Sequence, residues 1–480
     1  MAQFRPNLAL IAVLRFRSVA LFTGLACVWA GAQELDEPEN SAATPAAEIA
    51  AAPADPSGSA ATAETDGDFD ADAAALLAEI PTEAHLSWLE AQIEFLDLVK
   101  EGRLEEALPI AEEMVPLAAA DFGDPSAEVA TALSNLAIIQ RNLELYDESK
   151  ENYLAAIDMY RQVEGPFTAS IIDPLVSLGA NYHATGDYLQ ALGLFQEART
   201  VNRRAYGLLN EDQVEIVYHI SATLASMRRY EEAHLQQEDA LRLMERVDGT
   251  DTLEILPHIY KYAEWLVSAF QFEAARTQYV RAMDIIRMRE NENSILLVHP
   301  LTEIGNSYRT QKLAEGRGVS ALKRALEIAE SQENRDSLAV ARVLRDIGDW
   351  YTAFSRVGAT GEEYLQAWAL LGDVEDGDAL RREWFDEPEY VLREYPSTRG
   401  LTEANERGAV EGYVRVVFDV DESGKPQNAA VLESEPAGFK DNTMLRAIRR
   451  SRFRPRVVGG EFAYAPGLIR NFTFHYQPEE

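Results

Sequence analysis

The sequence predicts an α+β protein in which about seven helical hairpins, over residues 84–372, are followed by a small β-β-α-β domain. Two observations carry this prediction. Over most of the chain, large apolar and small residues recur with a period of 42 residues, which is typical of stacked helical hairpins. Near the C-terminus, apolar residues occupy every second position, as at Val414, Val416 and Phe418, which is typical of a strand.

The 42-residue period is visible in several columns of residues. One column of large apolar residues consists of Leu104, Tyr146, Tyr188, Tyr230 and Phe272, each followed three positions later by a small residue. Another consists of Leu136, Leu178, Ile220, Tyr262, Ile304 and Ile347, each followed immediately by a small residue. Small residues at matching positions let two antiparallel helices approach closely. A single hairpin cannot bury its own apolar faces, so we expect successive hairpins to stack.

These columns resemble tetratricopeptide repeats, most clearly at residues 178–182 and 186–191 with Phe195 and Ala198. The period is longer than the standard repeat of about 34 residues and is similar to the kinesin-light-chain type. The resemblance implies a protein-binding array whose groove is lined by the first helix of each hairpin. The residues that this register directs into the groove are Ser134, Arg141, His183, Tyr218, Tyr260, Glu264, Thr302, Asn306, Arg309, Arg345 and Asp349. As a set, such a mixture suits an extended peptide, whereas for any one of these residues ordinary exposed helix surface is the simpler interpretation.

The last 80 residues, 401–480, resemble the C-terminal domain of TonB. The matching segments are residues 410–414, 417–424, 431–438, 445–455 and 472–474, in the order and spacing of that family. The resemblance implies a periplasmic domain that binds extended segments of outer-membrane receptors by strand addition. Its expected partner-binding residues are Arg470, Asn471 and Thr473 on the last strand and the basic cluster Arg446, Arg449 and Arg450. The alternative for the basic cluster is a solvated helix face that offsets the acidity of the repeats.

The N-terminal residues predict export. Residues 1–32 have the parts of a secretory signal peptide, with arginines before an apolar stretch and Ala30-Gly31-Ala32 before Gln33. We therefore expect a periplasmic protein. Two alternatives are a lipid anchor at Cys27, the only cysteine, and an uncleaved anchor in the inner membrane. Residues 33–82 lack Lys and Arg and predict a disordered acidic linker. Residues 373–400, which are interrupted by Pro388, Pro396 and Gly400, predict a second linker.

Composition narrows the classes of function. The formal net charge of −36 argues against nucleic acid as a partner, because a phosphate backbone requires a basic surface. The seven histidines have no metal-ligand spacing, and neither a phosphate-binding loop nor a nucleophile motif is present. The sequence thus predicts no enzyme activity, no cofactor, no metal and no small-molecule substrate. The expected partners are proteins or extended peptides, with outer-membrane receptors among the candidates.

Three functional hypotheses fit these features. In the first, the chain is a periplasmic adaptor whose repeats hold one partner while the TonB-like domain binds another. In the second, it is a TonB-family energy transducer anchored by an uncleaved N-terminus. The absence of any histidine before His85 and the helical repeats in place of a Pro-rich spacer favour binding without energy transduction. In the third, it is an architectural protein of the envelope.

Overall fold

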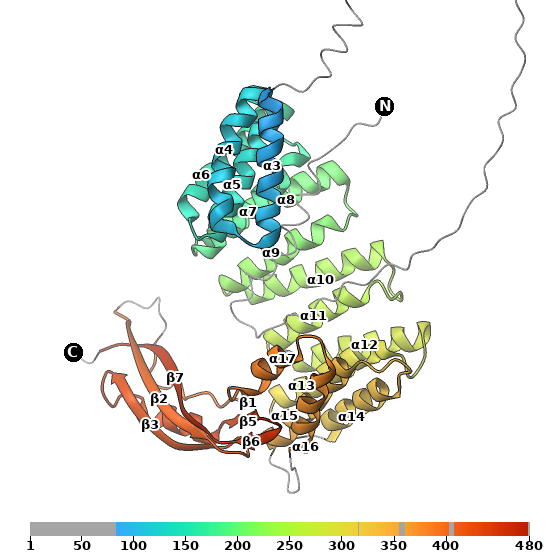
Figure 1. Cartoon of the computed structure of the whole chain (residues 1–480), viewed down its shortest axis with the longest axis vertical. Coiled ribbons are helices and arrows are strands. Elements are labelled where there is room, and N and C mark those ends of the chain that lie inside the picture. The colour runs from blue at the N-terminus through green and yellow to red at the C-terminus, as the bar shows by residue number, and fades with distance from the viewer. Residues whose placement is uncertain (1–82, 315, 355–360, 403–407, 479–480) are drawn as a thin grey trace, which may run out of the picture. The chain divides into compact units, whose positions relative to one another are not determined.

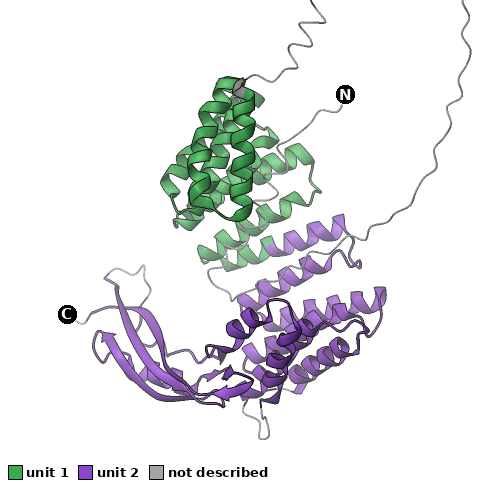
Figure 2. Cartoon of the chain, in the orientation of Figure 1, with its two compact units in different colours: residues 1–236 green, residues 237–480 purple. Residues whose placement is uncertain are grey.

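The computed structural model describes residues 83–478, apart from 315, 355–360 and 403–407. The predicted signal peptide and the predicted linker over residues 33–82 lie outside this part of the chain. The chain divides into two compact units, Met1–Gln236 and Gln237–Glu480 (Figure 2). Each unit is built mainly from antiparallel helical hairpins.

The first unit holds hairpins that follow one another along the chain (Figure 1). They are α3 (Glu83–Glu101) with α4 (Leu104–Phe122), α5 (Ala127–Asn142) with α6 (Tyr146–Glu164), α7 (Ile172–Ala184) with α8 (Tyr188–Tyr206), and α9 (Asp212–Ser226) with α10 (Tyr230–Val247). A short 3₁₀ helix, η2 (Ala169–Ile171), precedes α7. Helix α10 continues into the second unit.

The second unit completes the set of hairpins. It contains α11 (Leu256–Ser268) with α12 (Phe272–Arg289), α13 (Val298–Thr310) with α14 (Gly316–Ser331), and α15 (Ser337–Phe354) with α16 (Glu362–Leu370). The short 3₁₀ helix η3 (Ile295–Leu297) precedes α13. The described residues thus form seven hairpins, which confirms the predicted helical part of the fold.

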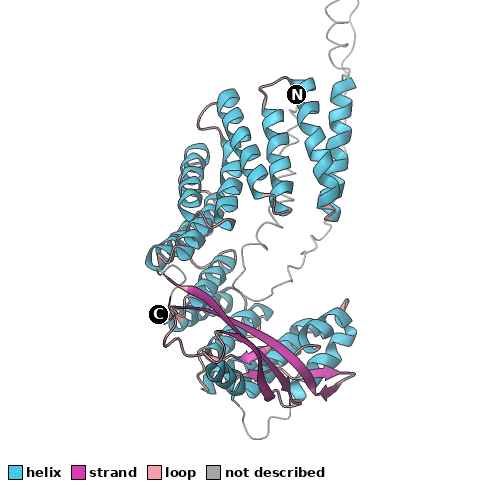
Figure 3. Ribbon diagram, turned by 90° about the vertical axis from the view of Figure 1, so that its left-hand side faces the viewer, coloured by secondary structure: helices cyan, strands magenta, loops and turns pink. Residues whose placement is uncertain are grey.

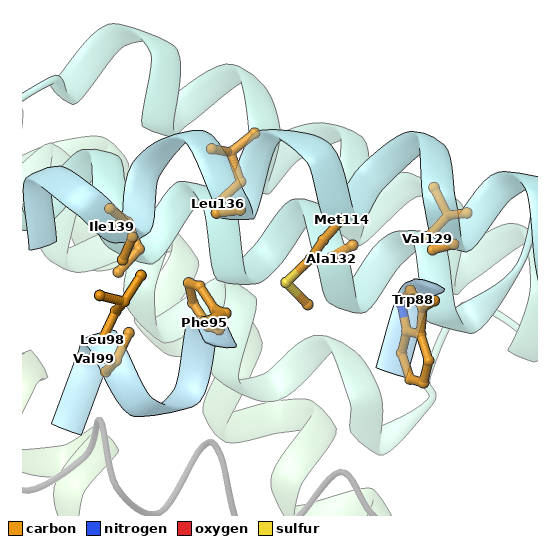
Figure 4. Packing of buried hydrophobic residues seen from close by; sticks show 12 residues of the cluster. Trp88, Phe95, Leu98, Val99, Met114, Val129, Ala132, Leu136 and Ile139 are labelled. Atoms are coloured by element: carbon orange, nitrogen blue, oxygen red, sulfur yellow. The ribbon is translucent and has the colours of Figure 1, made fainter. Parts of the chain in front are cut away.

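The repeating columns explain how each hairpin closes. The residues of the large apolar column are the first residues of α4, α6, α8, α10 and α12. The small residues lie where the two helices touch, as shown by Ser149 Oγ, which donates to the carbonyl oxygen of Ala137 at 2.7 Å. Larger side chains fill the adjoining space. Figure 4 shows Phe95, Met114 and Leu136 in the cluster that unites α3, α4 and α5.

The C-terminal domain has the predicted β-β-α-β order. Strands β2 (Val410–Val420), β3 (Pro426–Glu435) and β7 (Ala465–Tyr476) form an antiparallel sheet in the order β3-β2-β7, and α18 (Asp441–Arg450) packs against it. Figure 3 shows these strands in magenta. The alternating residues Val414, Val416 and Phe418 are fully buried, as their spacing predicts. Three short strands that the sequence did not indicate separate α18 from β7: β4 (Arg452–Phe453), β5 (Arg456–Val458) and β6 (Glu461–Ala463).

The sequence predicts a linker over residues 373–400, but in the structure this segment contains a helix and a strand. After the 3₁₀ helix η4 (Leu371–Asp373) it forms α17 (Gly377–Phe385) and strand β1 (Tyr390–Leu392), which pairs antiparallel with β4. Trp384 and Phe385 are buried in a cluster that also holds Tyr364 of α16 and Val457 of β5. The segment therefore belongs to a core shared by the last hairpins and the C-terminal domain.

In the part of the chain that the structure describes, no helix combines the length and apolar character that crossing a membrane requires.

Candidate binding surfaces

Among the described residues, the outer edge of β7 has no strand partner over most of its length. On its inner side β7 pairs with β2 from Tyr476 to Ala465. On its outer side, the bridging contact found among the described residues is at His475, whose carbonyl oxygen accepts the amide of Thr402 at 2.9 Å. The predicted residues Asn471 and Thr473 are exposed on this strand. An extended segment can therefore add to β7, because an edge strand presents unpaired amides and carbonyls.

Arg470 corrects one expectation for this edge. The sequence analysis directs its side chain outward, but the side chain is half-buried and lies over the ring of Tyr390, 5.8 Å from the centroid. Its Nη2 donates to the carbonyl oxygen of Pro388 at 3.4 Å. Because Arg470 alternates with Phe472 and Phe474, it shares their face of the strand and contacts the β1 segment.

The basic cluster of α18 is exposed. Arg446, Arg449 and Arg450 point away from the buried side of the helix, where Met444 and Ile448 pack. Arg449 Nη2 donates to the carbonyl oxygen of Ala429 at 3.3 Å. The cluster thus presents positive charge on the surface of an otherwise acidic chain.

The groove residues predicted in the first unit lie half-buried on the first helix of their hairpins. Ser134 Oγ donates to the carbonyl oxygen of Ala130 within α5. Nε2 of His183 lies 3.1 Å from Ser226 Oγ, and burial lowers the pKa of His183 despite a backbone hydrogen bond to Ala222. Arg141 lies in the last turn of α5, and Tyr218 lies on α9.

In the second unit the predicted groove residues fall into two sets. Tyr260, Glu264, Thr302 and Asn306 lie on α11 and α13. The other three are covered by the chain itself, which corrects their assignment to an open groove. Arg309 Nη1 donates to the carbonyl oxygen of Val391 at 2.8 Å, and the guanidinium of Arg345 lies 4.5 Å from the centroid of the Trp384 ring.

Asp349, the third of these residues, forms a buried ion pair with Arg454 of the C-terminal domain. Arg454 Nε and Nη2 donate to the two carboxylate oxygens of Asp349 at 3.0 and 2.9 Å. Arg454 Nη1 donates to the carbonyl oxygen of Trp384 at 3.1 Å and to Glu389 at 3.2 Å. Burial by itself would raise the pKa of Asp349, but the charge and hydrogen bonds of Arg454 lower it to about 2.

The sequence places Asp349 in the predicted groove and does not single out Arg454, which lies within the matching segment 445–455. Asp349 falls in the groove register, and Arg454 belongs to the Arg452-Phe453-Arg454-Pro455 motif of the C-terminal resemblance. The two residues are 105 positions apart, and no period connects them. Pairing of the two opposite charges offsets part of the cost of withdrawing both from water, and the buried Asp349 is therefore not available in an open groove.

Comparison with known proteins identifies both parts of the chain. Residues 129–168 and 170–246 match tetratricopeptide repeat families, and residues 402–475 match the Gram-negative bacterial TonB protein C-terminal family. The predicted resemblances are thus confirmed. The chain carries tetratricopeptide repeats, which are protein-binding modules, followed by a TonB-like module. No curated protein matches the sequence.

Solved structures similar to the chain include three helical proteins. BtubC (BKLC) from P. vanneervenii has 16% identity and a TM-score of 0.34, with 52% of this chain and 94% of that chain covered. The C-terminal part of a TPR repeat-containing protein from Cytophaga hutchinsonii has 12% identity and a TM-score of 0.38, with 61% and 98% covered. Kinesin light chain TPR-like repeats from Podosopora anserina have 13% identity and a TM-score of 0.30, with 53% and 100% covered.

Proposed function

We propose that this protein is an exported adaptor of the periplasm with two protein-binding surfaces. The repeats hold an extended segment of one partner. The TonB-like domain adds a strand of a second partner, an outer-membrane receptor, to β7. The observation that carries this proposal is the edge position of β7, which among the described residues is bridged on its outer side at His475, in a domain that matches the TonB C-terminal family.

The signal-like residues 1–32 support export. The two matched modules are of kinds that bind proteins, which supports a role in binding without enzyme activity. N-terminal sequencing of the chain recovered from the envelope tests the first point. A start at Gln33 supports a released periplasmic protein. A retained N-terminus supports the anchored transducer instead.

The ion pair between Arg454 and Asp349 shapes how such an adaptor works. The TonB-like domain is fastened to the last hairpin through a buried charge pair and a shared apolar core. Binding at β7 therefore occurs on a domain held by the last repeats. This arrangement favours a fixed link between two partners over a flexible tether.

Site-directed photocrosslinking tests strand addition. With Cys27 replaced by Ser, each variant carries a single cysteine. We expect Asn471→Cys on β7, labelled with benzophenone-maleimide, to crosslink to an outer-membrane receptor identified by mass spectrometry. Leu432→Cys is the matched control, because Leu432 is exposed on β3 at the opposite edge of the same sheet. Equal crosslinking at both edges, or none at Asn471→Cys, contradicts strand addition at β7.

A further inference from the structure

A cluster of aromatic and acidic side chains lies on the repeats of the second unit. Tyr260 and Glu264 are one turn apart on α11, and His299 and Glu303 are one turn apart on α13. Residues four apart share a helix face, so each helix contributes one ring and one carboxylate. Tyr279 of α12 completes the cluster. Tyr260 and Glu264 belong to the predicted groove, whereas the other three residues are not among the predicted site residues.

The three rings pack closely together. The centroids of Tyr260 and His299 are 4.4 Å apart, and Tyr279 lies 6.3 Å from Tyr260 and 6.4 Å from His299. Burial lowers the pKa of His299 to about 4, so its ring is neutral at physiological pH. The rings thus offer electron-rich faces without competing positive charge, which is the arrangement that attracts a cation.

The hydroxyl of Tyr279 is an unsatisfied buried group. The side chain is fully buried, and its oxygen has no hydrogen-bond partner among the described residues. Burial raises the pKa of this phenol, and the charges of Glu303 and Glu264 raise it further. A buried polar atom without a partner is costly. A ligand with N–H groups would satisfy the lone pairs of this oxygen.

The cations near these carboxylates do not balance them. Burial and the charges of Asp346 of α15 and Glu264 of α11 raise the pKa of Glu303 to about 7, although Arg309 acts to lower it. The nearby guanidinium of Arg309 donates to Val391 and Asn306. Arg345 is hydrogen-bonded to Asp346, and Lys261 acts to lower the pKa of Glu264, which burial raises. Glu264 is exposed and Glu303 half-buried, so solvent and ligands reach the cluster.

We propose that Tyr260, Glu264, Tyr279, His299 and Glu303 form a subsite for a lysine or arginine side chain of an extended partner segment. The cation lies against the rings, the carboxylates neutralise it, and Tyr279 Oη accepts one of its N–H groups. The acidic character of the chain also favours a basic partner. This inference rests on the proposed function and specifies the chemistry of the segment that the repeats hold.

Fluorescence anisotropy with defined peptides tests the subsite. The probe is a fluorescein-labelled, acetylated and amidated 12-residue Gly/Ser peptide with a Lys at every third position, added to the full chain from Gln33. A second peptide carries norleucine in place of each Lys, which keeps the methylene chain and removes the charge. We expect the Lys peptide to bind at least tenfold more tightly than the norleucine peptide.

Variants of single residues test where on the chain the Lys peptide binds. Glu303→Gln is expected to weaken binding of the Lys peptide at least tenfold. Glu273→Gln, which removes the same charge from an exposed position on α12, is expected to change affinity less than twofold. Tyr279→Phe removes only the unsatisfied hydroxyl and is expected to weaken binding about threefold or more. Circular dichroism of each variant confirms that the helices are retained.

The pH dependence gives a second readout. Because Glu303 must be ionised to pair with a cation, affinity of the wild-type chain is expected to rise between pH 5.5 and 8, whereas Glu303→Gln is expected to show a flatter profile. Equal weakening by Glu303→Gln and Glu273→Gln would show diffuse attraction and overturn the subsite. So would equal affinity for the two peptides. If the Lys peptide does not bind while Asn471→Cys still crosslinks to a receptor, the proposed subsite is wrong, and the proposed strand addition at β7 is retained.

Discussion

At the scale of single residues, the buried pair of Arg454 and Asp349 gives the sharpest prediction. Replacing Asp349 by Asn keeps the shape of the side chain but leaves the guanidinium of Arg454 buried, with the exposed Glu389 as its remaining carboxylate. Breaking a buried pair on one side costs about 3–5 kcal/mol. We expect Asp349→Asn to lower the free energy of unfolding by about 3 kcal/mol in urea denaturation.

A surface ion pair is the control for this variant. Asp284 pairs with Arg287 at 3.2 Å and is largely exposed, so Asp284→Asn is expected to cost less than about 1 kcal/mol. The double variant Asp349→Leu with Arg454→Met is expected to recover most of the lost stability, because well-packed apolar residues replace such a pair without leaving a charge unpaired. Similar losses of stability in the single and double variants would show that altered packing, and not an unpaired charge, causes the loss.

The same pair predicts a pH dependence. Asp349 has a pKa of about 2, below its ordinary value of 3.8. A carboxyl group whose folded-state pKa is depressed stabilises the fold above its ordinary pKa, and this contribution is lost as pH falls toward the folded value. We therefore expect the stability difference between wild type and Asp349→Asn to be constant from pH 7 to about 5 and to shrink between pH 4 and 2. A difference that persists at pH 2 would contradict this assignment.

At the scale of the hairpin, close packing of helices depends on single glycines. A Cβ at Gly179 would lie 2.7 Å from the ring of Phe195, which is fully buried and has no room to move. We expect Gly179→Ala to destabilise the chain by about 1–2 kcal/mol through overpacking. Gly193 in the second helix of the same hairpin has nothing within 4 Å, so Gly193→Ala is expected to stabilise by up to about 1 kcal/mol. Thermal denaturation of both variants measures the contrast.

The turns inside the hairpins carry a second 42-residue period. Residues at positions 102, 144, 186, 228, 270 and 312 all have a positive φ, yet only Gly102 and Gly186 are glycines. A left-handed backbone costs a non-glycine residue about 1–2 kcal/mol. We expect Glu144→Gly, at φ 63°, to raise the free energy of unfolding by about 1 kcal/mol. Glu148→Gly, inside α6, is expected to lower it. The opposite order in urea denaturation would show that the Glu144 side chain matters more than its backbone.

These elements show which parts of the fold could be predicted from the sequence. The hairpins follow from columns of residues that each hairpin repeats, so the same packing is encoded many times. The alternating residues of β2 define the sheet in the same way. The contact of Trp384, Val391 and Arg454 with the last hairpins occurs once, without a period, between segments far apart in the chain. Long-range pairs of this kind have no local signature, so the predicted groove included residues that the chain itself covers.

At the scale of the second unit, the C-terminal domain and the last hairpins share one core. Val457 of β5 packs with Tyr364 of α16 and Trp384 of α17, and the amide of Arg454 donates to the carbonyl oxygen of Glu389 at 2.8 Å. Strand β4 also has β1 as its partner, with Phe453 opposite Tyr390. A fragment that begins at residue 400 therefore lacks the strand partner of β4 and both carboxylates that pair with Arg454, those of Asp349 and Glu389. A fragment of residues 400–480 is expected to be much less stable than the same domain in the full chain.

Native-state hydrogen exchange tests this shared core without cutting the chain. Segments that unfold as one cooperative unit exchange their most protected amides with the same free energy of opening. We expect the amides of Phe453 and Arg454 to share one value with the central amides of α15, and Asp349→Asn to lower all of them by the same amount. Amides of α5 and α6 in the first unit serve as the internal reference and are expected to keep their protection. If the variant lowers protection in α15 while β4 is unchanged, the domain opens independently of the repeats, and the fixed link proposed for the adaptor must be abandoned.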